Sequence, residues 1–265
     1  MSESSDEPTA EPVLAVDSLE KQFGGITAVE DVSFDIQPGS LTGLIGPNGA
    51  GKSTTFNCIS GTLTPTSGTV HFQGTEITDA PSHVVAEHGL FRTFQIAREL
   101  EEMTVLENLL LAPPNQLGES LIYAVTPGLR QRVQKQEREL RERAWELLER
   151  FELEHLAREY AGSLSGGQRK LLELARALMA EPSMVLLDEP LAGVNPTLET
   201  QLLEGLHELR EEGYTFLLVE HDMNVIMNHC DPIIVMHQGS ILTVGTADEI
   251  RSNDRVIDAY LGGDR

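Results

Sequence analysis

The chain has 265 residues, 40% of them hydrophobic, and a formal net charge of −23. This length provides a substantial core in one large domain or two small ones, and the composition excludes wholesale disorder. A chain this acidic is repelled by phosphate backbones and by anionic lipid headgroups, so we expect no nucleic-acid partner. The two cysteines form no close-spaced pair, which is typical of a reducing cytosol.

The N-terminal part of the chain predicts a tail followed by strands. Residues 1–11 are acidic and polar and predict a flexible tail. Apolar and polar residues alternate at 13–19 and at 32–36, on either side of a glycine pair, which predicts two strands of a small antiparallel sheet. Further strands are expected at 41–45 and 70–74, and a helix is expected to begin at Lys52.

The middle of the chain has helical periodicity, from Val105 to about Ala180. The densest part, 131–151, alternates Arg and Glu with apolar residues at helical spacing, which predicts a long amphipathic helix. Its charged face either is solvated or serves as a surface for a partner.

Strands and helices alternate again in the C-terminal part. Apolar runs at 184–187, 216–219 and 233–236 predict buried strands, and 198–212 predicts a helix. Strands separated by helices indicate a mostly parallel sheet that is covered on both faces. The sequence therefore predicts an α/β fold in which a helical segment, approximately 96–180, is inserted between two halves of the sheet.

A glycine-rich motif follows the strand predicted at 41–45. It reads G-x-x-x-x-G-K-S and opens a predicted helix, which is the context of a phosphate-binding loop. Glycines let backbone N–H groups surround phosphate oxygens, and the helix N-terminus adds its positive dipole end. We expect ATP to be bound by Gly46, Pro47, Asn48, Gly49, Ala50, Gly51, Lys52, Ser53 and Thr54. In this motif the lysine reaches the β- and γ-phosphates and the serine hydroxyl ligates Mg²⁺.

Two acidic residues end the apolar strand at 184–187. Ligands of open α/β sheets bind at the carboxyl ends of the strands. Asp188 is therefore placed to hold Mg²⁺ through water, and Glu189 to orient or deprotonate an attacking water. Together with the glycine loop, this pair predicts a P-loop NTPase with a RecA-like core. The alternating segments at 13–19 and 32–36 predict its antiparallel β subdomain.

A second glycine motif, Leu164-Ser165-Gly166-Gly167-Gln168, precedes the helix predicted at 169–180. A capping box explains Ser165 and Gln168, because these residues have the S-x-x-Q spacing. It does not explain two glycines, which are costly in a first helical turn. Bare N–H groups at a helix start suit an incoming phosphate.

At this point the sequence resembles the ABC-transporter ATPase family, whose signature motif is Leu-Ser-Gly-Gly-Gln. The resemblance runs from Val13 to Gly263, with the motifs in the family's order, and implies one ATP-binding domain over 12–265. It implies that Phe23 stacks on adenine, that Gln95 contacts Mg²⁺ and senses a membrane partner, and that His221 contacts the γ-phosphate. The alternatives are an ordinary turn aromatic, a surface glutamine and a structural histidine.

One position departs from the general family pattern. Asn195 stands where the family has Asp, which removes a charge that could serve communication across a dimer interface. Asn at this position is seen in the branched-chain amino-acid transporter subfamily. The segments 23–29, 92–95 and 258–263 and the inserted stretch near 113–135 are similar to that subfamily as well. This resemblance implies uptake of branched-chain amino acids or a similar small solute.

Other functions remain as alternatives at this point. The urea-uptake and lipopolysaccharide-export ATPases look similar, and some ABC proteins are non-transport switches in DNA repair or on ribosomes. Those switches usually have a long coiled-coil insertion or two ATPase domains, and this chain has neither. An inactive nucleotide-binding subunit is disfavoured because Glu189 and His221 are both present.

The resemblance also implies partners. In this family a complete site needs two chains placed head to tail, so that ATP on the glycine loop of one chain meets Ser165 and Gly167 of the other. The second chain is identical or a related ATP-binding subunit. A membrane-embedded permease would receive the opening and closing of this dimer at the cytoplasmic face of the cell membrane. Helices at 96–112 would form part of the groove in which the permease docks. An extracellular solute-binding protein would act indirectly.

The basic residues favour a halophilic origin. Only four of the 19 are lysines, as in acidic, lysine-poor proteins from salt-loving microbes. Because molar salt screens the repulsion between carboxylates, we expect the melting temperature to rise in molar KCl. Thermal unfolding followed by circular dichroism at increasing KCl checks this expectation. A melting temperature that is indifferent to salt would instead indicate an ordinary acidic mesophilic protein.

Overall fold

The structure is a computed structural model, and it describes residues 11–93, 100–114, 116–117 and 127–261. The tail predicted at 1–11 therefore lies outside the described residues, except for Glu11. The chain divides into two compact units, which we call the first and the second unit. The first unit comprises Met1–Arg92, Ser183–Glu189 and Leu209–Arg265, and the second comprises Thr93–Pro182 and Pro190–Glu208.

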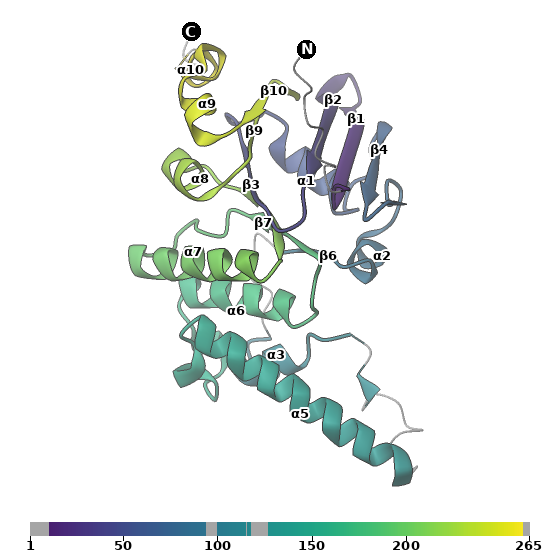
Figure 1. The fold of residues 1–265 in the computed structure, drawn as a ribbon, viewed down its shortest axis with the longest axis vertical. Helices are drawn as coiled ribbons and strands as arrows, with labels where there is room; N and C mark the ends of the chain where they lie inside the picture. Colours follow the sequence, from purple (N-terminus) through teal and green to yellow (C-terminus); the bar gives the residue numbers. More distant parts are fainter. Residues whose placement is uncertain (1–10, 94–99, 115, 118–126, 262–265) are drawn as a thin grey trace, which may run out of the picture. The chain divides into compact units, whose positions relative to one another are not determined.

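The first unit contains a six-stranded sheet in the order β10-β9-β3-β8-β7-β6 (Figure 1). The five strands from β9 to β6 run parallel, and β10 pairs antiparallel with β9 at one edge. All residues of β3, β7 and β8 are buried, as expected for parallel strands covered on both faces. The strands are β3 (Leu41–Ile45), β6 (Leu90–Arg92), β7 (Met184–Asp188), β8 (Thr215–Val219), β9 (Ile233–His237) and β10 (Ser240–Gly245).

The register of this sheet brings three loops to the same edge. Asp188 at the end of β7 pairs with Val219 of β8, and Val219 pairs with Leu44 of β3. The segments that follow these strands therefore leave the sheet side by side. They are the glycine loop after β3, Glu189 after β7 and His221 after β8, which is the arrangement of a ligand site in an open α/β sheet.

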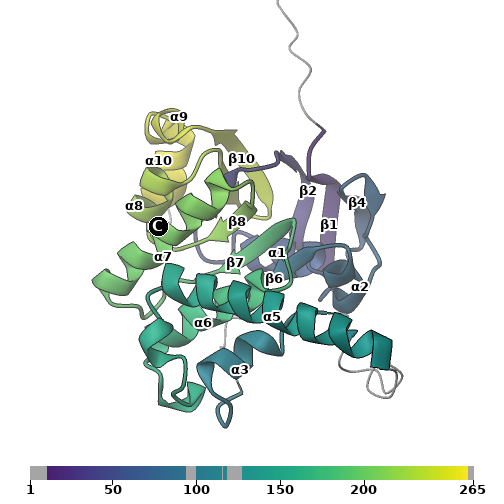
Figure 2. The same ribbon diagram turned by 60° about the horizontal axis from the view of Figure 1, so that its bottom comes forward.

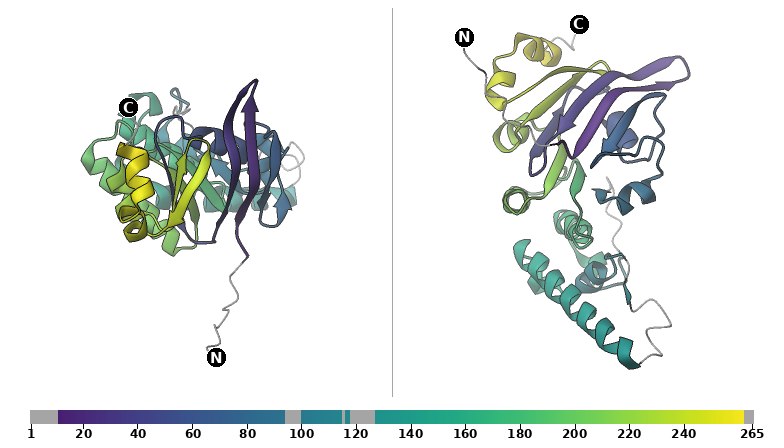
Figure 3. Two further views of the ribbon diagram at one scale, coloured as in Figure 1. Left: turned by 90° about the horizontal axis from the view of Figure 1, so that it is seen from above. Right: turned by 45° about the vertical axis from the view of Figure 1, so that its right-hand side comes forward.

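A four-stranded antiparallel sheet completes the framework of the first unit, in the order β2-β1-β4-β5. The two antiparallel strands predicted at 13–19 and 32–36 are confirmed as β1 and β2, which are longer than expected and form a hairpin. Figure 3 shows its strands beside β9 and β10, and the Glu30 N–H of β2 donates to the Gly239 carbonyl at 2.8 Å. The strands are β1 (Leu14–Phe23), β2 (Ile26–Ile36), β4 (Ser67–Phe72) and β5 (Thr75–Glu76).

The helices of the first unit are short. Helix α1 begins at Lys52, as predicted, and the others were not predicted from the sequence. Helices of five to eight residues span too few turns to show a 3.6-residue period. They are α1 (Lys52–Ile59), α2 (Ser82–Glu87), α8 (Met223–His229), α9 (Ala247–Arg251) and α10 (Asp254–Leu261).

The second unit is helical. Figure 2 shows α5 lying along α6 with α3 nearby. The helix predicted at 169–180 begins three residues earlier, because Ser165 is its N-cap and the two glycines form its first turn. The elements are α3 (Val105–Leu110), α5 (Pro127–Arg150), short 3₁₀ turns at Glu154–Leu156 and Ala161–Ser163, α6 (Gly166–Leu178) and α7 (Pro196–Glu211), whose last turn belongs to the first unit.

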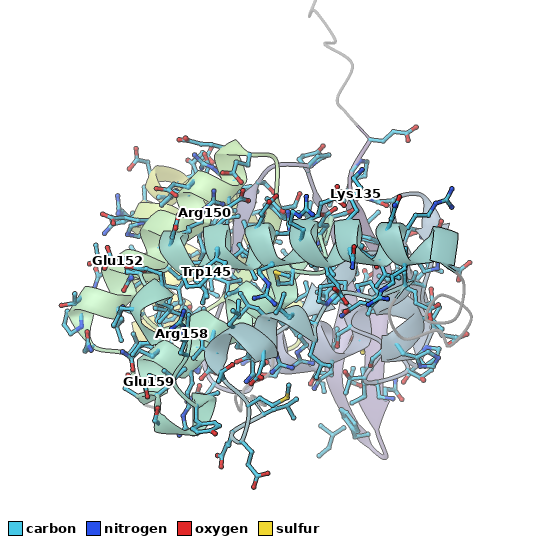
Figure 4. All side chains as sticks on the ribbon, turned by 90° about the horizontal axis from the view of Figure 1, so that it is seen from below. Lys135, Trp145, Arg150, Glu152, Arg158 and Glu159 are labelled. Atoms are coloured by element: carbon cyan, nitrogen blue, oxygen red, sulfur yellow. The ribbon has the colours of Figure 1, made fainter. Side chains whose placement is uncertain are left out.

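Helix α5 has the predicted amphipathic character. Ala144, Leu147 and Leu148 are buried, and the exposed Lys135 and Glu139 form an i,i+4 ion pair at 3.4 Å. Figure 4 shows Lys135 toward the start of the helix and Arg150 at its end. Among the described residues, no helix combines the length and the apolarity needed to cross a membrane.

Candidate active site

The glycine loop joins β3 to α1 through backbone conformations that require glycine. At Gly46, with φ +156°, a Cβ would overlap the Met236 carbonyl oxygen. At Gly51, with φ +100°, it would lie 2.7 Å from the Ala28 carbonyl oxygen. Gly51 is also the N-cap of α1 and offers no side-chain cap, so the dipole end of the helix opens directly into the loop.

Lys52, the first residue of α1, folds back over this loop. Its Nζ donates to the Gly46 carbonyl at 2.6 Å and to the Pro47 carbonyl at 3.2 Å. Burial lowers the pKa of Lys52, and the nearby Glu189 carboxylate partly opposes this shift. An anionic ligand in the loop would favour the ammonium form and offset the cost of its desolvation.

A pocket of about 390 Å³ lies over the loop, and its size is within the range of small-ligand sites. It contains the exposed Ser53 hydroxyl and the Glu189 and His221 side chains, all from the first unit. Its described lining consists of Ala28, Asn48, Gly49, Ala50, Gly51, Lys52, Ser53, Thr54, Glu189 and His221.

One carboxylate oxygen of Asp188 accepts a hydrogen bond, and the other has no hydrogen-bond partner among the described residues. Its Oδ2 accepts from Arg92 Nη2 at 2.7 Å, and its side chain is only 2% exposed. Its Oδ1 is buried and has no hydrogen-bond partner among the residues that the structure describes. An orphaned buried oxygen of this kind needs a partner, and Mg²⁺ is commonly bound through one carboxylate, waters and substrate phosphates. Asp188 and the Ser53 hydroxyl thus fit a Mg²⁺–nucleotide ligand.

Glu189 and His221 form a hydrogen-bonded pair in the pocket. Glu189 Oε1 lies 2.8 Å from His221 Nε2, so either side chain can orient the other. Glu189 has φ +50°, a left-handed conformation that non-glycine residues rarely adopt. Its N–H donates to the Val219 carbonyl at 2.9 Å, which holds the strained residue at the end of the sheet.

The other predicted residues of the first half of the chain are less closely tied to the pocket. Phe23 ends β1, is 48% exposed, and carries the Lys21 ammonium 5.2 Å from its ring centroid. It pairs in register with the exposed Ile26 and is not among the described residues that line the pocket. Gln95 lies outside the described residues.

The signature turn belongs to the second unit. The Ser165 hydroxyl accepts from the Gln168 N–H at 3.4 Å, and Gln168 Oε1 accepts from the Ser165 N–H at 2.9 Å, so the predicted capping box is confirmed. A Cβ at Gly167 would lie 2.6 Å from Leu198 Cδ1, so packing disfavours a larger residue here unless the Leu198 side chain shifts. A Cβ at Gly166 would meet no described atom within 4 Å, and packing therefore leaves Gly166 unexplained.

Asn195 has a structural role that accounts for its side chain. Its Oδ1 accepts from the Leu198 N–H at 3.0 Å, directly before α7, and Pro196 is the first residue of that helix. Asn before Pro is a favourable helix start. Asp is an equally good N-cap, so helix capping alone does not select Asn over the family's Asp.

We expect the helix cap at Asn195 to contribute measurably to the free energy of unfolding. Asn195→Ala should lower the free energy of unfolding by about 1 kcal/mol, while Asn195→Asp should leave it nearly unchanged. Urea unfolding of both variants followed by circular dichroism checks this. Equal losses in the two variants would contradict the capping role.

Two residues near the site escaped sequence reasoning. Arg92 belongs to the segment 92–95 that resembles the branched-chain subfamily, but no site role was predicted for it, and it binds Asp188. Tyr260 of α10 forms a hydrogen bond with the Gly46 backbone at the start of the glycine loop. Burial raises the pKa of Tyr260 to about 12, and this hydrogen bond partly opposes the rise. Both residues come from segments far from Gly46 in sequence, so only the fold reveals their positions.

Comparison with known proteins identifies the family. Residues 29–192 match the family model described as ABC transporter, and residues 240–265 match that of branched-chain amino acid ATP-binding cassette transporters. The high-affinity branched-chain amino acid transport ATP-binding protein BraF of Pseudomonas aeruginosa is 42% identical, covering 95% of this chain and 98% of BraF. LivG of Escherichia coli K12, with the same description, is 41% identical, covering 96% of this chain and 99% of LivG.

Solved structures agree with these relatives. MJ1267, an ATP-binding cassette of an ABC transporter in its ADP conformation, has a TM-score of 0.80 and 38% identity, covering 96% of this chain and all of MJ1267. The dimeric structure of MJ0796, a bacterial ABC transporter cassette, has a TM-score of 0.71 and 27% identity, covering 88% of this chain and 98% of MJ0796.

ATP hydrolysis is general to the family that these matches define, and the predicted P-loop NTPase fold is confirmed. The chain therefore belongs to the ABC transporter family of ATP-binding proteins, within the group that includes the branched-chain amino acid transport ATP-binding proteins.

Proposed function

We propose that this chain binds ATP with Mg²⁺ and hydrolyses it to power the uptake of branched-chain amino acids through a separate permease. One observation supports the ATPase mechanism above all others. The glycine loop, Asp188 and the Glu189–His221 pair lie together at one edge of the sheet. The substrate class rests on the names of relatives that match almost the whole chain.

The glycine loop and Lys52 would hold the phosphates. Backbone N–H groups at the start of α1 would bind the phosphate oxygens. The Lys52 ammonium, already beside Gly46 and Pro47, would turn to the β- and γ-phosphates. Mg²⁺, when bound, would neutralise phosphate charge that develops during the reaction. Ser53 and Asp188 are the described residues that we assign to it, and Gln95 is the third residue that the family resemblance assigns.

Glu189 would act as the general base. Its carboxylate lies in the pocket and is held by His221, so it can orient a water and accept its proton. His221 is half-exposed in the same pocket and would contact the γ-phosphate through the ring edge not used by Glu189. Phe23 would stack on adenine, since its aromatic side chain is 48% exposed.

A second chain would complete the site. Ser165, Gly166 and Gly167 start a helix with an uncrowded Gly166, and such a helix start binds phosphate well. We propose that this turn meets the γ-phosphate bound by a partner subunit placed head to tail. The dimeric structure of the related cassette MJ0796 supports the presence of a second chain. Hydrolysis would remove the bridging γ-phosphate and open the dimer.

The remaining partners follow from the role as an ATPase subunit. We assign the chain to the cytoplasmic face of the membrane as a peripheral subunit, acting as one ATP-binding domain over 12–265. The helical insertion at about 96–180 would contact the permease, with Gln95 at its start. An extracellular solute-binding protein would act only through the permease.

Gene replacement in the organism that carries this chain tests the substrate. Deletion should abolish the high-affinity uptake of radiolabelled leucine, isoleucine and valine and leave urea uptake unchanged. The parent gene should restore uptake, and a Glu189→Gln copy should not. Loss of urea uptake with unchanged leucine uptake would replace the proposed substrate, and restoration by the Glu189→Gln copy would contradict energy coupling by this ATPase.

A further inference from the structure

Arg92 lies at the end of β6 and contacts two elements of the nucleotide site. Its Nη2 donates to Asp188 Oδ2 at 2.7 Å. Its Nη1 donates to Asn57 Oδ1 at 2.6 Å and to Ser60 Oγ at 3.1 Å, both at the C-terminal end of the glycine-loop helix α1. The guanidinium also lies over the Phe56 ring, 5.5 Å from its centroid.

These contacts fix the guanidinium independently of Asp188. Three groups of α1 hold it, and the Arg92 side chain is only 18% exposed, so it has little freedom to move away. The planar fork of an arginine can serve Asp188 with one nitrogen and α1 with the other, which a lysine cannot do. Asp188 is therefore tied to the helix that carries Lys52 and Ser53.

Arg92 uses only one of the two oxygens of Asp188. Oδ2 is occupied by the guanidinium, whereas Oδ1 is buried without a hydrogen-bond partner among the described residues. A guanidinium that competed with a metal would be expected to take both oxygens in the bidentate geometry that arginine favours. The one-sided contact instead leaves an oriented oxygen for a cation.

We propose that Arg92 is a positioning residue that orients the Asp188 carboxylate toward Mg²⁺ and couples it to α1. Arg92 itself touches neither the metal nor the nucleotide. This proposal rests on the proposed function, because it names the residue that prepares the metal ligand of that site. Partners behind metal ligands commonly change metal affinity by 10- to 100-fold when they are removed.

Metal binding, rather than turnover, provides the test. Mn²⁺ serves as the probe, titrated into the full-length protein with saturating ADP, and free Mn²⁺ is followed by electron paramagnetic resonance. Arg92→Met should weaken Mn²⁺ binding by about tenfold or more. ADP affinity measured in EDTA should stay near the parent value, because the described contacts of Arg92 are with Asp188 and the C-terminal end of α1 and not with the glycine loop.

A double-mutant cycle separates positioning from general damage. In an Asp188→Asn background, Arg92→Met should weaken Mn²⁺ binding no further. Arg143→Met is the matched control, because the Arg143 side chain, in the second unit, is also largely buried at 26% exposure and donates to the Leu178 carbonyl. It should bind Mn²⁺ like the parent.

Arg92→Lys keeps the positive charge and provides the test if Arg92→Met does not fold. It should bind Mn²⁺ more weakly than the parent, since one ammonium cannot reach both Asp188 and α1. Parent-like or tighter Mn²⁺ binding in the Arg92 variants would overturn the positioning role, as would a full effect that persists beside Asp188→Asn. A parent protein that does not bind ADP would instead refute the proposed function.

Discussion

Glu189→Gln is expected to retain ATP binding and to lose hydrolysis by about 100- to 10,000-fold, the range of a general base. Glutamine keeps the size of the side chain and can still hydrogen-bond to His221, which lies 2.8 Å from Glu189 in the parent. It cannot accept a proton from water at neutral pH. ATP therefore stays intact, and the dimer that it holds together should accumulate.

Phosphate release measures the loss of hydrolysis, and size-exclusion chromatography measures the accumulation of the dimer. The Glu189→Gln protein should release phosphate at a background rate and elute as a dimer only in ATP. Glu181→Gln serves as the matched control, because Glu181 is exposed in the second unit and pairs with Arg143 instead. Hydrolysis at the parent rate in Glu189→Gln would remove Glu189 from the mechanism.

Lys52→Ala is expected to have the second large effect, a loss of about 100- to 1,000-fold in ATP turnover. The Lys52 ammonium is buried beside the glycine loop, and its pKa is lowered by that burial. A preorganised cation in such a site acts strongly on phosphate charge because little water screens it. The alanine variant leaves the loop glycines in place but removes that charge.

Steady-state hydrolysis and fluorescent-nucleotide binding measure the Lys52→Ala effect, and thermal unfolding checks that the variant folds. Lys135→Ala is the matched control. Lys135 has a side chain that is 77% exposed on α5 and contacts Glu139, so its loss should leave turnover unchanged. Parent-like turnover in Lys52→Ala would refute the role assigned to the glycine loop.

The sheet and the glycine loop could be predicted because their signals are local. A run such as 184–187 is too short and too apolar for anything but a buried strand in this context. The G-x-x-x-x-G-K-S spacing specifies a loop conformation that other residues cannot adopt, and the structure shows this at Gly46 and Gly51. Parallel pairing then brings the strand ends to one edge.

Other parts of the site could not be predicted because they depend on contacts across the fold. Nothing in the sequence near Arg92 indicates that its guanidinium reaches Asp188, 96 residues later. The predicted start of the helix at 169 was wrong, since the capping box begins the helix at Gly166. The two glycines of this helix start also differ in their surroundings, because Gly167 packs closely against Leu198 and Gly166 meets no described atom within 4 Å.

The central claim is that ATP is bound between the glycine loop of one chain and the signature turn of another. The most direct measurement is a crystal structure of the Glu189→Gln protein grown with ATP and Mg²⁺. The account predicts two ATP molecules per dimer, each with its γ-phosphate between Lys52 of one chain and Ser165 of its partner. ATP bound away from Gly46–Ser53, or bound there without a second chain over its γ-phosphate, would contradict it.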